Sequence, residues 1–148
     1  MKTQIMFLLA SSAMSSFSPA FATETGEMKL KAMAELNWQT TPEGVAFAPL
    51  QGNRFEESYM AMVRLPAGLS SPLHIKSAAM FGVVLSGEIL HLAGDQEETS
   101  GKALKPGAFY GIPAGLPHVS KCVSAVDCVT FLFQDGPFDF LPIEESGR

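Results

Sequence analysis

Apolar and polar residues alternate in short runs from Leu36 onward. In the segment 59–65, residues 59, 61, 63 and 65 form one set and residues 60, 62 and 64 the other, as expected for a strand whose side chains point alternately to two faces. Further apolar runs lie at 45–49, 81–85, 88–92, 109–112, 118–123 and 128–133. Turn residues recur about every eight to twelve positions, and no long window has helical periodicity. The pattern predicts an all-β domain, a small sandwich or barrel.

The first 22 residues have a different pattern. Lys2 precedes the apolar run 5–10, a stretch of small residues follows, and Ala20-Phe21-Ala22 forms a cleavage signal. This arrangement is typical of a secretory signal peptide, and its apolar core is too short to span a bilayer. We therefore predict a signal peptide at 1–22, a flexible segment at 23–35, one domain at 36–143 and a tail at 144–148. The mature protein is expected in the periplasm or the medium, without membrane association.

Length and charge narrow the classes of partner. Of the 148 residues, those after position 22 suffice for one compact domain and are too few for two. The formal net charge is −5 and no basic run is present. These features argue against nucleic acid and anionic membranes as partners.

Cys122 and Cys128 are the two cysteines of the chain. A hairpin centred on Ala125 would place them opposite each other, which predicts a cross-strand disulfide in an oxidising compartment. Closing so short a loop stabilises a fold by about 2 kcal/mol on the chain-entropy argument. Free thiols or a metal thiolate remain the alternatives.

Two segments carry the candidate chemistry, 68–87 and 107–122. Each opens with a glycine and places a histidine on an expected strand after a turn that contains proline: His74 in the first and His118 in the second. If the two strands are neighbours in an antiparallel sheet, both imidazoles can face one cavity. Neutral imidazole is a common ligand for zinc, iron, nickel and copper.

The two segments resemble the two motifs of the cupin superfamily. The first cupin motif is Gly, five residues, His-x-His, three or four residues, Glu, six residues and Gly; here Lys76 stands for the second His and Met80 for the Glu. The second motif is Gly, five residues, Pro-x-Gly, two residues, His, three residues and Asn, with Cys122 here in place of the Asn. The resemblance implies a single-domain cupin, a double-stranded β-helix or jelly-roll barrel, with two of the usual four metal ligands retained.

Lys76 and Met80 each allow two interpretations. An ammonium group repels a metal cation, so Lys76 is either a sign that the metal is lost or a residue at the pocket mouth with its amine in water. Met80 is either an apolar filler or a soft sulfur ligand that would join His74 and His118 around copper. Arg64 and Tyr110 lie on strands and could reach a ligand; for Arg64 the alternative is a position on the surface. His91 belongs to neither motif and is interpreted as a surface or capping residue.

A narrower resemblance runs from Trp38 to Pro142. The wording P-L-H, V-V-L-S-G, P-A-G-x-P-H, C-V-S-x-x-D-C and Q-D-G-x-F-D-F-L-P is similar to exported single-domain cupins related to the zinc-binding cupin half of the ChrR anti-sigma factor and to acetylacetone-cleaving dioxygenases. The aromatic tail after Asp135 is expected to pack on the barrel. Cupins often pair through edge strands, so a homodimer is a further expectation.

Two functions follow as hypotheses. The first is a barrel that binds a small, anionic molecule near Lys76, His74 and His118, with Arg64 and Tyr110 as further contacts and no metal. The second is a metal-dependent enzyme, an oxidoreductase of the dioxygenase kind or an isomerase, in which His74, His118 and Met80 hold one divalent ion of zinc, iron, nickel or copper that acts as a Lewis acid.

Overall fold

A computed structural model describes residues 26–94 and 96–143. The chain divides into two units, Met1–Leu30 and Lys31–Arg148, and every assigned helix and strand lies in the second. The predicted signal peptide at 1–22 and tail at 144–148 lie outside the described residues. Within those residues, no helix combines the length and the hydropathy needed to cross a bilayer.

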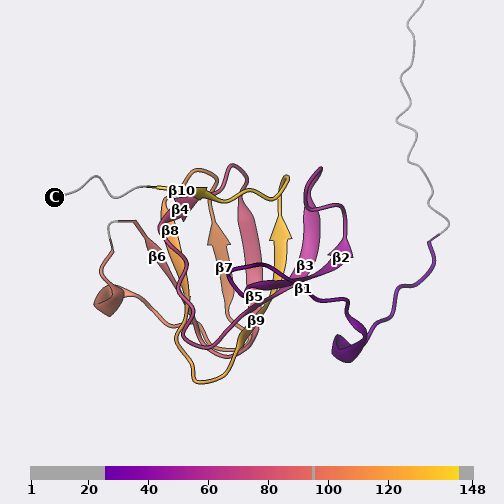
Figure 1. Cartoon of the computed structure of the whole chain (residues 1–148), viewed down its shortest axis with the longest axis horizontal. Coiled ribbons are helices and arrows are strands. Elements are labelled where there is room, and N and C mark those ends of the chain that lie inside the picture. The colour runs from indigo at the N-terminus through magenta and orange to yellow at the C-terminus, as the bar shows by residue number, and fades with distance from the viewer. Residues whose placement is uncertain (1–25, 95, 144–148) are drawn as a thin grey trace, which may run out of the picture. The chain divides into compact units, whose positions relative to one another are not determined.

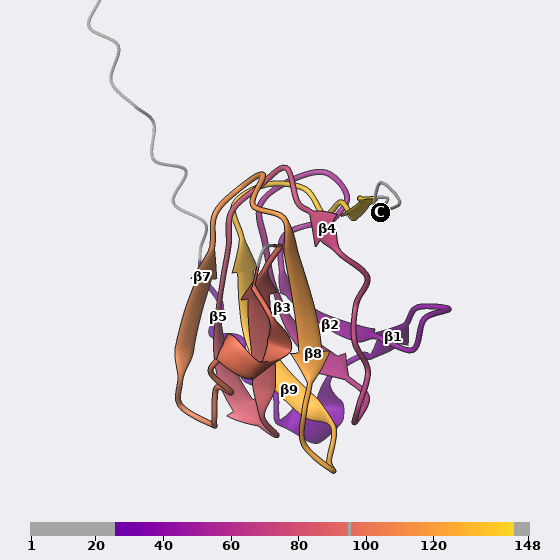
Figure 2. The ribbon, with the colours of Figure 1, turned by 90° about the vertical axis from the view of Figure 1, so that its left-hand side faces the viewer.

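The strands form two antiparallel sheets (Figure 1), and Figure 2 shows β4 and β8 of the smaller sheet in front of strands of the larger one. The larger sheet has the order β1 (Gln39–Thr40), β2 (Ala46–Gln51), β3 (Tyr59–Leu65), β9 (Cys128–Gln134), β5 (Met80–Ser86), β7 (Phe109–Ile112). The smaller has the order β10 (Leu141–Pro142), β4 (His74–Ile75), β8 (His118–Cys122), β6 (Ile89–Ala93). Two short 3-10 helices, η1 (Met33–Glu35) and η2 (Glu98–Ser100), complete the described elements. The prediction of an all-β domain is confirmed.

The alternation along the strands explains which faces are buried. On β3, residues 59, 61, 63 and 65 are buried, while 60, 62 and 64 are partly or fully exposed. β9 pairs with β3 in full register and buries every second residue in the same way. Apolar burial of this kind stabilises by about 25 cal/mol per Å² removed from water. The buried set faces the smaller sheet, so the core lies between the two sheets.

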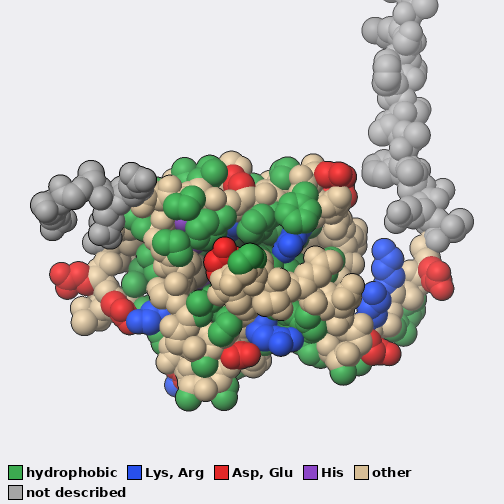
Figure 3. Space-filling model, in the orientation of Figure 1, with side chains coloured by type: hydrophobic (Ala, Val, Ile, Leu, Met, Phe, Trp, Pro, Cys, Tyr) green, Lys and Arg blue, Asp and Glu red, His purple; other side chains and the backbone are tan. Residues whose placement is uncertain are grey.

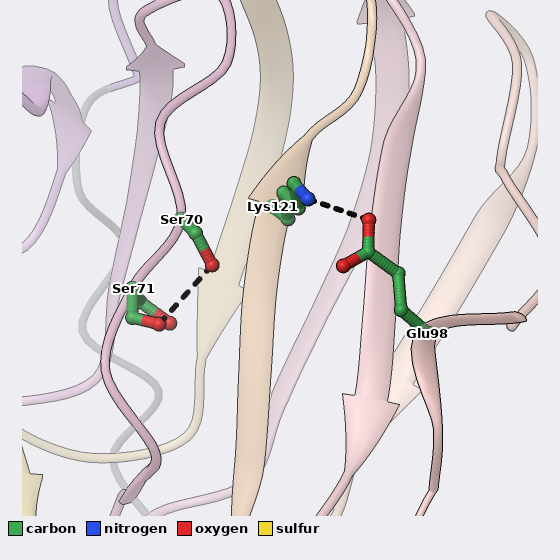
Figure 4. Close-up of polar contacts among 4 residues, drawn as sticks. All are labelled: Ser70, Ser71, Glu98 and Lys121. Atoms are coloured by element: carbon green, nitrogen blue, oxygen red, sulfur yellow. Dashed lines mark hydrogen bonds and ion pairs between the residues drawn. The ribbon is translucent and has the colours of Figure 1, made fainter.

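The segment before β4 is held alongside β8. Gly68 N–H donates to the Cys122 carbonyl, and Ser71 N–H donates to the Ser120 carbonyl. Figure 4 shows the neighbouring polar contacts: the Ser70 hydroxyl donates to the Ser71 carbonyl, and Lys121 of β8 forms an ion pair with Glu98 of η2. The two main-chain bonds from Gly68 and Ser71 hold the chain against β8 just before β4, and so determine where His74 lies.

The disulfide between Cys122 and Cys128 is confirmed, but the predicted hairpin around it is wrong. The two cysteines are joined with a Cα–Cα distance of 5.7 Å. Cys122 ends β8, which pairs with β4 and β6, whereas Cys128 begins β9, which pairs with β3 and β5. The turn therefore crosses from one sheet to the other. Spacing alone cannot distinguish this from a hairpin, because both bring the cysteines within bonding distance.

Removing the disulfide is expected to lower the free energy of unfolding by about 2 kcal/mol, the entropy of closing its short loop in the unfolded chain. The double variant Cys122→Ala/Cys128→Ala should show this in urea denaturation. Wild-type protein in reductant keeps both sulfur atoms in the core, so it separates loss of the cross-link from loss of packing. A reduced wild type as stable as the oxidised protein would contradict the prediction.

Candidate functional site: a pocket between the two sheets

A pocket of about 690 Å³ lies between the sheets, within the size range of small-molecule sites. Residues from both sheets and from the loop before β3 line it, and most are apolar. The aromatic ones are Phe47, Phe55, Tyr59, Tyr110, Phe138 and Phe140. The charged or titratable ones are Glu43, Arg54, His74, Lys76 and His91. Figure 3 shows hydrophobic side chains gathered over the upper part of one face, with a histidine and lysine or arginine atoms visible among them.

His74 and His118 are brought together as the motif spacing predicts. They are directly opposite each other in the register of β4 and β8, and their ring centroids are 4.2 Å apart. Only 3% of His74 and 2% of His118 are exposed. His74 also lines the pocket, whereas His118 is not one of the lining residues.

The hydrogen bonds of these two rings define their tautomers. Nδ1 of His74 contacts the Pro72 carbonyl and Nδ1 of His118 contacts the Leu116 carbonyl, each at 2.9 Å. A carbonyl can only accept, so both Nδ1 atoms donate and both Nε2 atoms carry the free lone pair. The Nε2 of His118 is buried without a hydrogen-bond partner.

His91 is a pocket residue, so its interpretation as a surface or capping residue is wrong. His91 on β6 pairs with Ser120 on β8. His118 precedes Ser120 by two residues, so His91 and His118 lie on the same face of the sheet. The ring centroid of His91 lies 4.3 Å from that of Tyr110, and its Nε2 is buried without a partner. Sequence reasoning could have placed His91 on the face of His118 if the pairing of β6 with β8 had been known, because His91 pairs with Ser120 and alternate residues of a strand share a face.

All three imidazoles are neutral at pH 7. Burial lowers the pKa of His74 to about 4, and the neighbouring His118 and Lys76 lower it further while the bond to Pro72 opposes them. Burial also lowers the pKa of His91 to about 4, with His118 and His74 contributing. The pKa of His118 is lowered chiefly by burial as well.

Lys76 is buried with its amine inside the pocket, not in water at the mouth. It is 8% exposed, and its Nζ donates to the main-chain carbonyl of Asp139. The Nζ lies 4.1 Å from the ring centroid of Phe138 and 5.7 Å from that of Phe140, at cation–π distance. Burial lowers the pKa of Lys76 to about 8, with the Asp139 carboxylate opposing the shift. The amine is therefore still mostly charged at pH 7.

The donors around His74 and His118 do not fit a metal centre. Catalytic zinc sites usually have three protein ligands, yet residues 26–94 and 96–143 include no group of three or more His, Cys, Asp or Glu placed to hold an ion. Lys76 brings a positive charge beside the imidazoles. Met80 is buried in the apolar cluster and lines the pocket, where it fills space as a flexible side chain does in irregular cores.

Tyr110 and Arg64 lie in different places. Tyr110 lines the pocket, and its hydroxyl donates to Thr130 Oγ1 at 3.4 Å. Arg64 does not line it; its Cζ lies 4.1 Å from the ring centroid of Trp38. The arginine that does line the pocket is Arg54, in the loop before β3. The sequence had no signal for it, because loop residues follow no period.

The aromatic tail closes one side of the pocket, which confirms that it packs on the barrel. Phe140 stacks on His74 with 4.1 Å between ring centroids, and Phe138 meets Phe47 edge to face at 5.4 Å. β10 pairs with β4, and the Asp139 carboxylate accepts from the Ser77 N–H. The tail is thus part of the site.

Comparison with solved structures shows the cupin fold and does not select one activity. The polyketide cyclase RemF from Streptomyces resistomycificus superposes with a TM-score of 0.66 at 17% identity, over 81% of this chain and 88% of that one. For the DMSP lyase DddQ from Ruegeria pomeroyi the values are 0.60 and 21%, over 78% of this chain and 64% of that one. For the complex of Rhodobacter sphaeroides SigE with the anti-sigma ChrR they are 0.57 and 21%, over 71% of this chain and 52% of the matched one. Enzymes and a regulatory protein complex thus share this architecture, and fold alone does not decide function.

Comparison with curated proteins found no similar sequence. Residues 26–139, most of the chain, match the family described as the ChrR cupin-like domain. The two motifs, the two-sheet architecture and the facing histidines agree with that match. The chain therefore belongs to the ChrR cupin-like domain family.

Proposed function

We propose that this protein binds a small, largely apolar molecule with a negatively charged group in the pocket between its sheets, without requiring a metal ion. The observation that carries the proposal is the buried amine of Lys76 in a pocket lined mostly by apolar side chains. Sites for small organic ligands combine an apolar lining with a few polar groups that orient the ligand. Lys76 is such a group.

The charge at Lys76 favours an anion. Its hydrogen bond goes to a neutral main-chain carbonyl, and it takes part in neither of the two ion pairs among the described residues. A positive charge in a low-dielectric site attracts an anion more strongly than the same charge does in water. The two neutral imidazoles that line the pocket, those of His74 and His91, add hydrogen-bonding capacity without a competing charge.

We also propose that the protein works outside the cytoplasm, in the periplasm or the medium. The disulfide between Cys122 and Cys128 supports this, because such bonds persist in oxidising compartments. The signal-peptide pattern at 1–22 agrees with it.

Binding of a matched pair of probes tests the proposed function. In isothermal titration calorimetry, 3-phenylpropionate should bind the wild-type protein, and the neutral 3-phenylpropionamide should bind more weakly. Lys76→Met keeps the apolar stem and removes the charge, so it should weaken carboxylate binding about tenfold, the equivalent of about 1.4 kcal/mol. The amide should be little affected.

Two results would contradict the proposal. One is that neither probe binds. The other is that zinc, copper, nickel or iron raises the melting temperature of the protein and His118→Ala abolishes the effect, which would support the metal-dependent enzyme. Circular dichroism of each variant provides the control for folding.

A further inference from the structure

The structure points to Arg54 as the residue that recognises the charged group of the ligand, and to a monocarboxylate with a flat apolar or aromatic body as the ligand class. This inference rests on the proposed function and deepens it. Arg54 belongs to neither cupin motif and lies in the loop between β2 and β3.

The guanidinium of Arg54 is held among aromatic rings at the pocket wall. Its Cζ lies 4.5 Å from the ring centroid of Phe47, 4.6 Å from that of Phe55 and 5.6 Å from that of Phe138. Stacking of this kind orients the planar group while leaving its edge free to donate hydrogen bonds. The loop itself is tied to the tail, because the Phe138 N–H donates to the Arg54 carbonyl.

Arg54 has an unsatisfied donor. Its Nη1 is buried and makes no hydrogen bond in the described part of the chain. The two ion pairs among those residues, Lys105 with Glu88 and Lys121 with Glu98, do not involve it. A buried N–H without a partner is destabilising, and a carboxylate oxygen that accepts a hydrogen bond from Nη1 would remove that cost.

The charges along the pocket define how negative its ligand can be. Arg54 and Lys76 both lie at cation–π distance from the ring of Phe138, so one ligand can approach both. Glu43 also lines the pocket, and the imidazoles are neutral. The two positive charges are opposed by Glu43 in the lining and by the Asp139 carboxylate near Lys76, a balance that favours a singly charged anion over a phosphate dianion.

The remaining lining describes the body of that anion. Aromatic and aliphatic side chains make up most of the wall, and aromatic rings offer stacking and edge-to-face contacts to flat apolar groups. A carboxylate that binds Arg54 at the pocket wall would place its apolar part against this lining.

Arg54→Gln provides the test, and Arg64→Gln is its matched control because Arg64 stacks on Trp38 away from the pocket lining. Affinities for 3-phenylpropionate and 3-phenylpropionamide are measured by calorimetry on the full mature chain. We expect Arg54→Gln to weaken carboxylate binding tenfold or more and to change amide binding less than twofold. Arg64→Gln should bind both probes as the wild type does. Arg54→Lys keeps the charge but loses the planar set of guanidinium donors, so its affinity for the carboxylate should lie between those of the wild type and Arg54→Gln. If Arg54→Gln is unfolded, Arg54→Lys provides the test in its place.

The outcomes separate this inference from the proposed function. If neither probe binds the wild type, both are overturned. If both probes bind the wild type equally well, the anion preference of the proposed function falls together with the role of Arg54. If the carboxylate binds better than the amide but Arg54→Gln behaves as Arg64→Gln does, the proposed function stands and only the role of Arg54 is overturned. A selective loss of carboxylate binding in Arg54→Gln supports it.

Discussion

Replacing Gly82 by alanine is expected to lower the free energy of unfolding by about 3 kcal/mol or more, because it overpacks the core. A Cβ at this position would lie 2.3 Å from both Cζ and Oη of Tyr110 and 2.7 Å from the Phe131 carbonyl oxygen. Gly82 is directly opposite Tyr110 in the pairing of β5 with β7. The tyrosine ring is buried, lies against the His91 ring and donates from its hydroxyl to Thr130, so it has little room to move.

Gly111→Ala is the matched control for this prediction. Gly111 lies on β7, where a new Cβ would meet the partly exposed ring of Phe81 at 3.1 Å. That ring can turn toward solvent, so the control should differ from the wild type by about 0.5 kcal/mol or less, as surface changes usually do. Urea denaturation of both variants gives the comparison. Equal stability of Gly82→Ala and Gly111→Ala would show that Tyr110 does not cover Gly82.

Acidification from pH 6.5 to pH 4 is expected to destabilise the fold strongly. In the unfolded chain each histidine titrates near pH 6.5. In the folded chain the pKa values of His74 and His91 are lowered to about 4, and that of His118 is lowered too. The unfolded state therefore binds more protons throughout this window, so stability rises with pH and falls on acidification. Each histidine contributes up to about 1.4 kcal/mol per pH unit, and the three together up to roughly 4 kcal/mol per pH unit.

Urea denaturation at half-unit steps between pH 7 and pH 4 measures this slope. His91→Gln removes one titrating group and keeps a polar side chain, so its slope in the window should be smaller than that of the wild type. Carboxylates are common to both proteins and cancel in the comparison. A wild type whose stability is constant from pH 6.5 to pH 5 would contradict the prediction.

The alternation of side chains revealed much of the fold, and the motif spacing revealed the centre of the site. Period-two patterns identify which residues of one strand share a face, so the buried face of β3 could be predicted. They do not say which strands are neighbours. For that reason the turn between Cys122 and Cys128 was predicted as a hairpin, although it crosses between sheets, and His91 was separated from His118, although both face inward.

The two arginines illustrate the other limit of the sequence. Arg64 lies on a strand and could be placed on one of its faces, but which face is covered depends on Trp38, which precedes the strand by a long stretch of chain. Arg54 lies in a loop, and the ring it shares with Lys76 comes from the tail. Its surroundings arise from contacts that are distant in sequence, which no local pattern encodes.

The presence of lysine at position 76 has a broader consequence. Lys76 stands where the first cupin motif has its second histidine, so a position that supplies a neutral imidazole in that motif here supplies a buried ammonium group. Under the proposed function, this replacement and that of the motif's Glu by Met80 would change the charge that the pocket favours, while the two-sheet arrangement is kept.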